Sequence, residues 1–267
     1  PSGELRGGTR QVNISLRTNE IATCKYSTMP GVDYASMPNT FNMTNSGRHS
    51  ATVAGLSDEG NFTYYARCQD RQGNANNDDF VINFSVGTVY IRDVRVADRS
   101  NDAEEFLSGS VSLTSSDLEL MKDGSSLQRA VGVRWANVSL PPGAVIVKAY
   151  VNFTVDETGS LPLDLRFYGE ASDNAPKFSS ALKNISLRAR TSAFADWANV
   201  PAWSVVGSIQ QSPDISAVVQ EVVSRPGWSS INALAVIVTN ASANAGPRTA
   251  ASYDGGSMKA PLLHIEY

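Results

Sequence analysis

Apolar and polar residues alternate along most of this chain with a period of two, the spacing of half-buried β-strands. Turns rich in Gly, Asn and Asp separate the alternating segments. These segments run over residues 12–16, 62–68 and 80–86 in the first third of the chain, and over 147–155, 163–167, 185–189 and 234–238 in the remainder. The pattern predicts an all-β protein.

One stretch, residues 212–228, departs from this period. Its apolar residues recur at the helical spacing i, i+3, i+4, i+7, i+8, namely at Ile215, Val218, Val219, Val222 and Val223. Ser212 or Asp214 can cap the start, and the Arg-Pro-Gly run at 225–227 ends the pattern. We therefore expect a single short helix laid against the sheets.

The length of 267 residues is sufficient for two domains with separate cores. We expect an immunoglobulin/fibronectin III-like sandwich over residues 1–87 and a jelly-roll sandwich over residues 88–267, because about eight longer strands follow residue 88. No Pro-rich or Ser-rich linker separates them, so the sequence predicts a short connection.

A first resemblance lies in Leu56–Asn74, which reads LSDEGNFTYYARCQDRQGN. It resembles the later half of fibronectin III-like modules in bacterial and other surface proteins. Phe62 stands where that family usually has its corner Tyr, so the hydroxyl-to-backbone bond of the corner cannot form. The resemblance implies a spacer or adhesive unit.

A second resemblance covers roughly the last 170 residues. The segments that carry it are DWANVPAW at 196–203, Val218 to Gln220 in the helix, Ala233 to Val238, ASYD at 251–254 and PLLHIEY at 261–267. They resemble the DNRLRE-type jelly roll of surface proteins and of modules attached to carbohydrate-active enzymes. The family's Ser-x-Glu is replaced here by Ser252-Tyr253-Asp254.

Composition narrows the choice of partners. Hydrophobic residues make up 42% and charged residues 18% of the chain, with a net charge of -4. Neutral polar groups therefore cover the surface, and nucleic acid is disfavoured as a partner. No stretch approaches the 18 consecutive apolar residues that a membrane span needs, and no basic amphipathic helix occurs.

Cys24 and Cys68 both lie in strand-like segments of the first domain. In a secreted β-sandwich this pair predicts a disulfide, and the alternative is two buried free thiols. The chain starts at Pro1 without Met and alternates like a strand up to Tyr267, so we expect a removed leader or a unit of a longer polypeptide. Together these features predict an extracellular or cell-surface location.

Asn-x-Ser/Thr triplets exceed the number that chance would give. They fall at Asn13, Asn42, Asn61, Asn83, Asn137, Asn152, Asn184 and Asn240. In the strand segments the neighbours of the Asn point inward, so the Asn points to solvent. We expect N-linked glycans on both domains, and the alternative is that Asn and Thr are simply common outward residues.

Acidic residues gather in the run SNDAEE. Asp102, Glu104 and Glu105 are candidate ligands for a structural calcium ion, with Asp117 and Glu119 nearby. The spacing is not that of an EF-hand, and a solvated acidic loop is the alternative. No other cofactor is indicated.

All four tryptophans, Trp135, Trp197, Trp203 and Trp228, lie in the second domain. Exposed together, they would form a stacking platform for a sugar. We expect at least three of them to pack in the core instead.

Catalytic motifs are absent from the sequence. The two histidines, His49 and His264, accompany no nucleophile motif, and no Gly-x-Ser-x-Gly, Walker or HExxH pattern occurs. A glycosidase carboxylate pair leaves no pattern in a sequence, but no residue set points to one. We therefore predict a protein that is not an enzyme.

Two functions fit these features. The first is the repeating subunit of a glycosylated surface fibre or appendage, with head-to-tail contacts between copies that do not close. The second is a pair of carbohydrate-binding modules detached from a secreted polysaccharide-active enzyme. An exposed aromatic platform favours the second, and burial of most aromatic side chains favours the first.

Overall fold

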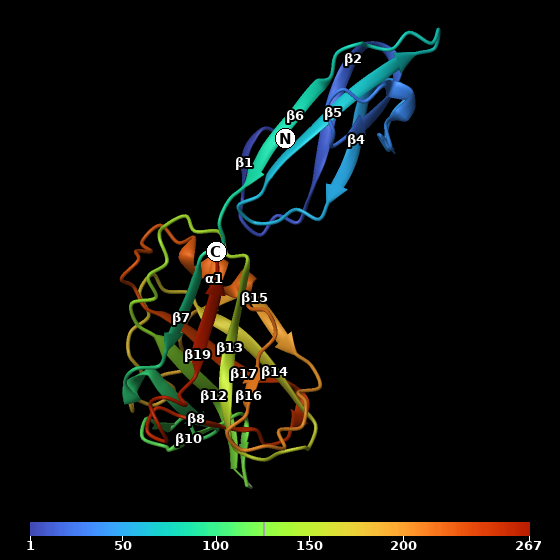
Figure 1. Ribbon diagram of the computed structural model, residues 1–267. Helices are drawn as coiled ribbons and strands as arrows, with labels where there is room; N and C mark the ends of the chain where they lie inside the picture. The colour runs from blue at the N-terminus through green and yellow to red at the C-terminus, as the bar shows by residue number, and fades with distance from the viewer. Residues whose placement is uncertain (125) are drawn as a thin grey trace. The chain divides into compact units, whose positions relative to one another are not determined.

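The structure is a computed structural model that describes residues 1–124 and 126–267, shown in Figure 1. The chain divides into two compact units, Pro1–Val89 and Tyr90–Tyr267. Strands dominate both units, and α1 (Ser216–Val223) is the one α-helix in the described part of the chain. The prediction of an all-β protein with one short helix is confirmed.

The first unit contains a short 3-10 turn, η1, and six strands. Their bounds are β1 (Gly3–Leu5), β2 (Gln11–Ser27), η1 (Tyr34–Ser36), β3 (Asn39–Thr40), β4 (Ser46–Ala54), β5 (Asn61–Asp70) and β6 (Phe80–Val86).

The six strands form one sheet of order β1-β6-β5-β2-β3, with β4 added beside the long strand β2. Strand β2 pairs with β4 before a register shift between Arg17 and Ala22, and with β5 after that shift. Because β2 leaves one partner and takes another, its inward residues Ile14 and Leu16 face the same core as Tyr64 and Phe84.

Cys24 and Cys68 are opposite each other in the β2–β5 ladder and form a disulfide, with Cα atoms 4.0 Å apart. The predicted disulfide is confirmed. Cys24 is fully buried in the core of the first unit, so the bond links two neighbouring strands from inside the sandwich.

The second unit contains thirteen of the described strands, one 3-10 turn and α1. The bounds are β7 (Ile91–Arg95), η2 (Arg99–Asn101), β8 (Asp102–Phe106), β9 (Val111–Ser112), β10 (Asp117–Glu119), β11 (Lys122–Asp123), β12 (Ser126–Trp135), β13 (Lys148–Glu157), β14 (Leu163–Glu170), β15 (Arg190–Trp197), β16 (Ile209–Gln211), β17 (Leu234–Ala245), β18 (Thr249–Ala251) and β19 (Leu262–Glu266).

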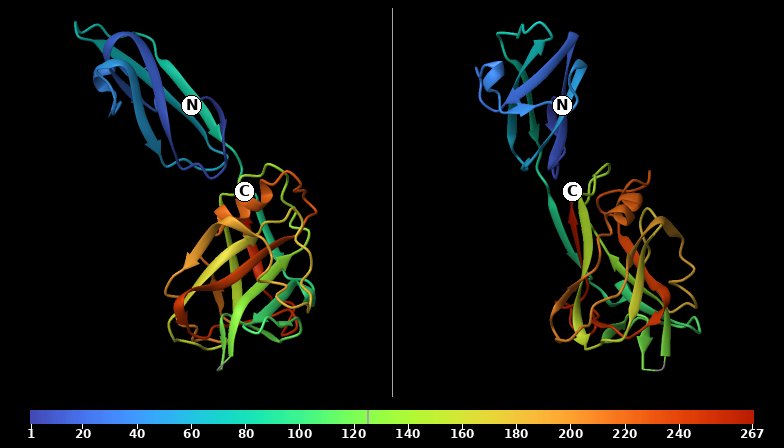
Figure 2. Two further views of the ribbon diagram at one scale, coloured as in Figure 1. Left: turned by 180° about the vertical axis from the view of Figure 1, so that it is seen from behind. Right: turned by 90° about the vertical axis from the view of Figure 1, so that its right-hand side faces the viewer.

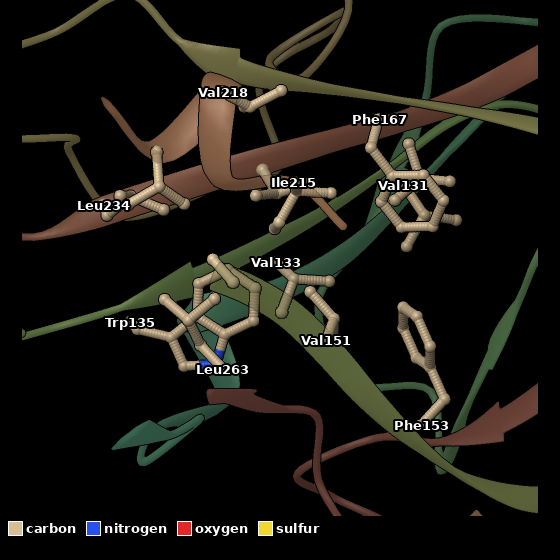
Figure 3. Packing of buried hydrophobic residues seen from close by; sticks show 14 of the residues in the cluster. Val131, Val133, Trp135, Val151, Phe153, Phe167, Ile215, Val218, Leu234 and Leu263 are labelled. Atoms are coloured by element: carbon tan, nitrogen blue, oxygen red, sulfur yellow. The ribbon is translucent and has the colours of Figure 1, made fainter. Parts of the chain in front are cut away.

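These strands form two facing sheets, which Figure 2 shows from behind and from the side. One sheet has the order β10-β18-β13-β19-β7, with β16 added beside β13. The other has the order β15-β14-β17-β12-β8-β9, with β11 added beside β12. Figure 3 shows Val131 and Trp135 of the second sheet converging with Val151 and Phe153 of the first.

The helix α1 is shorter than the apolar stripe that predicted it. Val218, Val219, Val222 and Val223 are buried against the sheets, as the spacing predicted. Neither proposed cap is at the N-cap position, which is held by Ile215. Instead Asp214 accepts hydrogen bonds from the amides of Ser216 and Ala149, at 2.8 and 3.1 Å, and so ties the helix start to β13.

One predicted strand is wrong. Residues 185–189 belong to a series of turns, because Leu187 is 76% exposed while Ile185 is fully buried, and Ala189 is exposed. The whole segment 171–189 lies over the outer face of the seven-stranded sheet, where Phe178 and Ile185 pack on small residues of β8, β12 and β17. Gly132 of β12 is required there, since a Cβ would lie 2.4 Å from the Phe178 ring.

Candidate functional site

The outward residues of β14 and β15 form a partly exposed surface of aromatic, basic and acidic side chains. In β14 the core side carries Leu163, Leu165 and Phe167, so Arg166 and Tyr168 point outward. In β15 Trp197 faces the core and Phe194 is outward and 48% exposed. We call Arg166, Tyr168, Arg190, Phe194 and Asp196 the β14–β15 face.

The ladder between the two strands places these residues opposite one another. Arg166 is opposite Asp196, Tyr168 is opposite Phe194, and Arg190 is opposite Glu170. Side chains directly opposite in an antiparallel pair lie on the same side of the sheet with Cβ atoms about 5 Å apart. The register therefore brings the five side chains into one row.

Stacking contacts continue along this row. The Tyr168 and Phe194 ring centroids are 5.8 Å apart, and the guanidinium carbon of Arg166 lies 4.1 Å from the Phe194 ring centre. The guanidinium carbon of Arg190 lies 5.0 Å from the centre of the Tyr168 ring. Each contact falls within the range of aromatic and cation–π interactions, so the two rings are held in place from both ends.

Arg166 is neutralised within the face. Its Nε and Nη2 donate to the two carboxylate oxygens of Asp196, at 2.5 and 2.7 Å. The hydrogen bonds that Arg166 makes with Asp196, and then with Tyr168, hold its pKa above its ordinary value. This bidentate pair fixes the guanidinium over Phe194 and leaves little net charge at that end of the row.

Contacts from the helix and from the 171–189 segment hold the two strands. Glu221 of α1 accepts hydrogen bonds from the amides of Ser192 and Ala193 in β15, at 2.8 and 2.7 Å. Arg188 forms a buried ion pair with Glu170 at 2.6 Å, where the covering segment ends. On the β14–β15 face Phe194 and Asp196 are exposed and the other three side chains are half-buried, so part of the face is accessible to a ligand.

The five acidic residues predicted near a calcium site lie on different faces. Glu105 accepts hydrogen bonds from the amides of Ile185 and Ser186, whereas Glu104 accepts one from the amide of Glu119. Asp102 accepts one from the amide of Tyr253, and Asp117 one from the hydroxyl of Ser115. Among residues 1–124 and 126–267 no group of three or more His, Cys, Asp or Glu could hold a metal ion. A structural calcium ion therefore stays a prediction, to be tested by calcium titration of chelator-treated protein.

Glu104, Glu119 and Asp102 are nevertheless unusual because they are buried. Burial raises the pKa of Glu104 to about 8 and that of Glu119 to about 7. It also raises the pKa of Asp102 to about 6. Glu119 accepts one hydrogen bond from the hydroxyl of Thr249 at 3.0 Å, and the nearby charges that act on the two glutamates are themselves acidic. Carboxyls in such surroundings remain protonated to higher pH than usual.

The four tryptophans are all buried, with exposed fractions from 0% for Trp135 to 9% for Trp197. The expected packing of at least three is met, and no tryptophan platform exists. The indole nitrogens of Trp135 and Trp228 donate to the carbonyls of Pro261 and Leu140. The exposed aromatic side chains of this unit are instead Phe194, at 48%, and Tyr90, at 59%.

The eight sequon asparagines differ in exposure. Five are exposed: Asn13, Asn42, Asn61, Asn83 and Asn137. Three are half-buried: Asn152, Asn184 and Asn240. The Asn184 side chain accepts hydrogen bonds from the Ser179 amide and from Arg188 Nη2, so a glycan there would require these contacts to break. Occupancy of all eight stays a prediction.

The histidines lie in structural contacts. His49 is buried between the hydroxyls of Thr18 and Thr44, at 3.1 and 2.9 Å, and burial lowers its pKa. His264 lies 2.7 Å from the Asp93 carboxylate and stacks on Tyr150. Neither imidazole has a Ser or Cys beside it in these contacts.

A cavity of about 470 Å³ opens on the first unit, at the point where β2 changes partners. Its lining includes Phe80, Arg17, Glu20, Asp70 and Asn74. Phe80 is 54% exposed, whereas the Asp70 carboxylate is used by the amides of the following turn. The cavity has the size of a small-ligand site, but its Asp70 carboxylate already accepts hydrogen bonds from the protein backbone.

Comparisons with family models and with curated proteins find no match for the chain. Among solved structures, it is similar to carbohydrate-binding modules of the β-sandwich superfamily, with 7% identity and a TM-score of 0.24, over 97% of this chain and 91% of that one. It is also similar to a protein of the mixed-linkage glucan utilization locus of Bacteroides ovatus, solved with a mixed-linkage heptasaccharide. That likeness has 10% identity and a TM-score of 0.20, over 99% of this chain and 50% of the other. At such TM-scores neither likeness identifies a family or a ligand.

No helix among the described residues has the length and apolar character to cross a membrane.

Proposed function

We propose that this chain is an extracellular, non-catalytic carbohydrate-binding protein whose β14–β15 face contacts the sugar. The observation that carries the proposal is the stacked pair of the half-buried Tyr168 and the exposed Phe194, held between two guanidinium groups. Pyranose rings present an apolar face that packs on aromatic rings, while their hydroxyls bond to Arg and Asp at the edges. The disulfide supports the extracellular location.

Binding to a panel of soluble polysaccharides, measured with the full chain by affinity electrophoresis, tests this function. Phe194→Ala removes half of the aromatic pair and is expected to weaken binding about tenfold, which corresponds to about 1.4 kcal/mol. Phe80→Ala is the matched control, because Phe80 is an exposed phenylalanine of the other unit. If Phe80→Ala abolishes binding and Phe194→Ala does not, the ligand lies in the cavity of the first unit. If the wild-type chain binds no polysaccharide, the function is wrong.

A second candidate is the repeating subunit of a glycosylated surface fibre or appendage, in which copies meet head to tail and the sequons carry N-linked glycans. It is favoured by the burial of all four tryptophans and by exposed sequon asparagines in both units, such as Asn13 and Asn137. Negative-stain microscopy of native material and intact glycopeptide mass spectrometry test it. Discrete monomers with unmodified asparagines would exclude the fibre.

A further inference from the structure

Arg190 has an unusual position at one end of the β14–β15 face. Its guanidinium is half-buried against the Tyr168 ring, and in the described part of the chain no carboxylate or hydrogen-bond acceptor contacts it. The carboxylate opposite it in the ladder, Glu170, is committed to Arg188 at 2.6 Å. The five N–H donors of Arg190 are therefore left for solvent or for a ligand.

We propose that the β14–β15 face selects anionic sugar units, which carry a carboxylate or a sulfate ester, and that Arg190 is the residue that recognises the anion. This inference rests on the proposed carbohydrate-binding function. A guanidinium that lies over a ring keeps its N–H edge free, and its planar fork matches the paired oxygens of a carboxylate or sulfate. A sugar ring that packs on Tyr168 or Phe194 would place its anionic group at that edge.

Charge within the face distinguishes the two guanidinium groups. Arg166 is satisfied by both oxygens of Asp196, so it positions Phe194 but offers little charge. Arg190 has no such partner, and a neutral sugar that covered it would bury an unpaired cation, which is unfavourable. An anionic sugar removes this cost because it supplies the missing acceptor.

The test compares the full wild-type chain with three variants in affinity electrophoresis. The probes are polygalacturonate for carboxylates, dextran sulfate for sulfate esters and dextran for neutral sugar. Arg190→Ala is expected to weaken binding to the anionic probes about tenfold or more. Arg190→Lys keeps the charge but loses the planar fork, so its affinity is expected to lie between those of the wild type and of Arg190→Ala. Arg92→Ala, at an exposed arginine of β7 in the same unit, makes the same change in net charge and is expected to leave binding unchanged.

The outcomes separate the two proposals. The inference is supported if polygalacturonate or dextran sulfate retards the wild-type chain and Arg92→Ala, but not Arg190→Ala. The probe that causes the retardation identifies the anion, a carboxylate or a sulfate ester. Equal losses in Arg190→Ala and Arg92→Ala would mean unspecific charge attraction and overturn it. Binding of the wild-type chain to neutral dextran alone also overturns it but leaves the carbohydrate-binding function intact. If no polysaccharide binds, both proposals are wrong.

Discussion

The buried carboxyl of Glu104 makes the stability of the second unit depend on pH. Glu104 is 3% exposed and accepts one hydrogen bond, from the Glu119 amide, and the charges that act on it come from Glu119, Asp117 and Asp123. Burial raises its pKa in the folded chain from the ordinary 4.5 to about 8. Between these two pH values the unfolded chain releases a proton that the folded chain keeps. Stability is therefore fully present below pH 4.5 and falls as the pH rises through about 8.

The loss of stability can be calculated from the difference between the pKa of Glu104 in the folded chain and in the unfolded chain. A carboxyl that titrates at 4.5 when unfolded and at about 8 when folded lowers the free energy of unfolding by about 1.4 kcal/mol per pH unit, on the order of 5 kcal/mol in all. Glu119, whose pKa is raised to about 7, adds to the same slope. Glu104→Gln keeps the size of the side chain and removes its proton equilibrium, so it is expected to stabilise the unit at pH 9 and to flatten the slope.

Urea unfolding from pH 5 to pH 9, followed by tryptophan fluorescence, measures this slope. All four tryptophans belong to the second unit, so the signal reports that unit alone. Glu105→Gln is the contrasting control, because Glu105 is just as buried but accepts three hydrogen bonds from Ile185 and Ser186, and its replacement is expected to destabilise the unit. A wild-type stability that rises from pH 5 to pH 9, or a Glu104→Gln variant less stable than wild type at pH 9, would refute the reasoning.

Two further predictions concern stability. Replacing Cys24 and Cys68 together by Ala opens a link across a sequence separation of 44 residues, and the first unit is expected to lose about 4 kcal/mol. Calorimetry should then show a lower unfolding temperature for the first unit and an unchanged unfolding temperature for the second unit. Gly132→Ala places a methyl group against the Phe178 ring and is expected to cost the second unit about 1–3 kcal/mol, measured by urea unfolding, whereas an unchanged midpoint would show that the covering segment can shift.

The strands with regular alternation and the helix were predictable because their apolar spacing is a local property of the sequence, whereas β4 and β15 were not predicted. The cross-strand pair of Cys24 and Cys68 was predictable for the same reason, since both lie in alternating segments. Segment 185–189 misled the prediction because it alternates like a strand, yet Ile185 alone is anchored by the core beneath it while Leu187 faces solvent. A pattern of five residues does not say whether a hydrogen-bonded neighbour is present.

The β14–β15 face could not be predicted, because it depends on the register between two strands that the whole segment 171–189 separates. Alternation in the sequence places Tyr168 on the outer side of its strand, and Phe194 on the outer side of another. It does not say that the two strands are neighbours, nor that Tyr168 lies opposite Phe194. The tryptophans were the aromatic residues considered for a platform, and their expected packing in the core agrees with the usual burial of large aromatic side chains.

The eight sequons lie outside β14 and β15, the two strands of the β14–β15 face. Strands β2, β5, β6, β13 and β17 contain sequon asparagines, whereas β14 and β15 contain none; Asn240 of β17 is opposite Leu165 of β14. A glycan on Asn152 would stand on the sheet that contains β13, and the β14–β15 face belongs to the other sheet of the same unit. A glycan on Asn152 would therefore leave Tyr168, Phe194 and Arg190 free to contact a polysaccharide, whereas Asn240 lies on the strand next to β14. Glycan occupancy and polysaccharide binding must accordingly be measured separately, because neither result predicts the other.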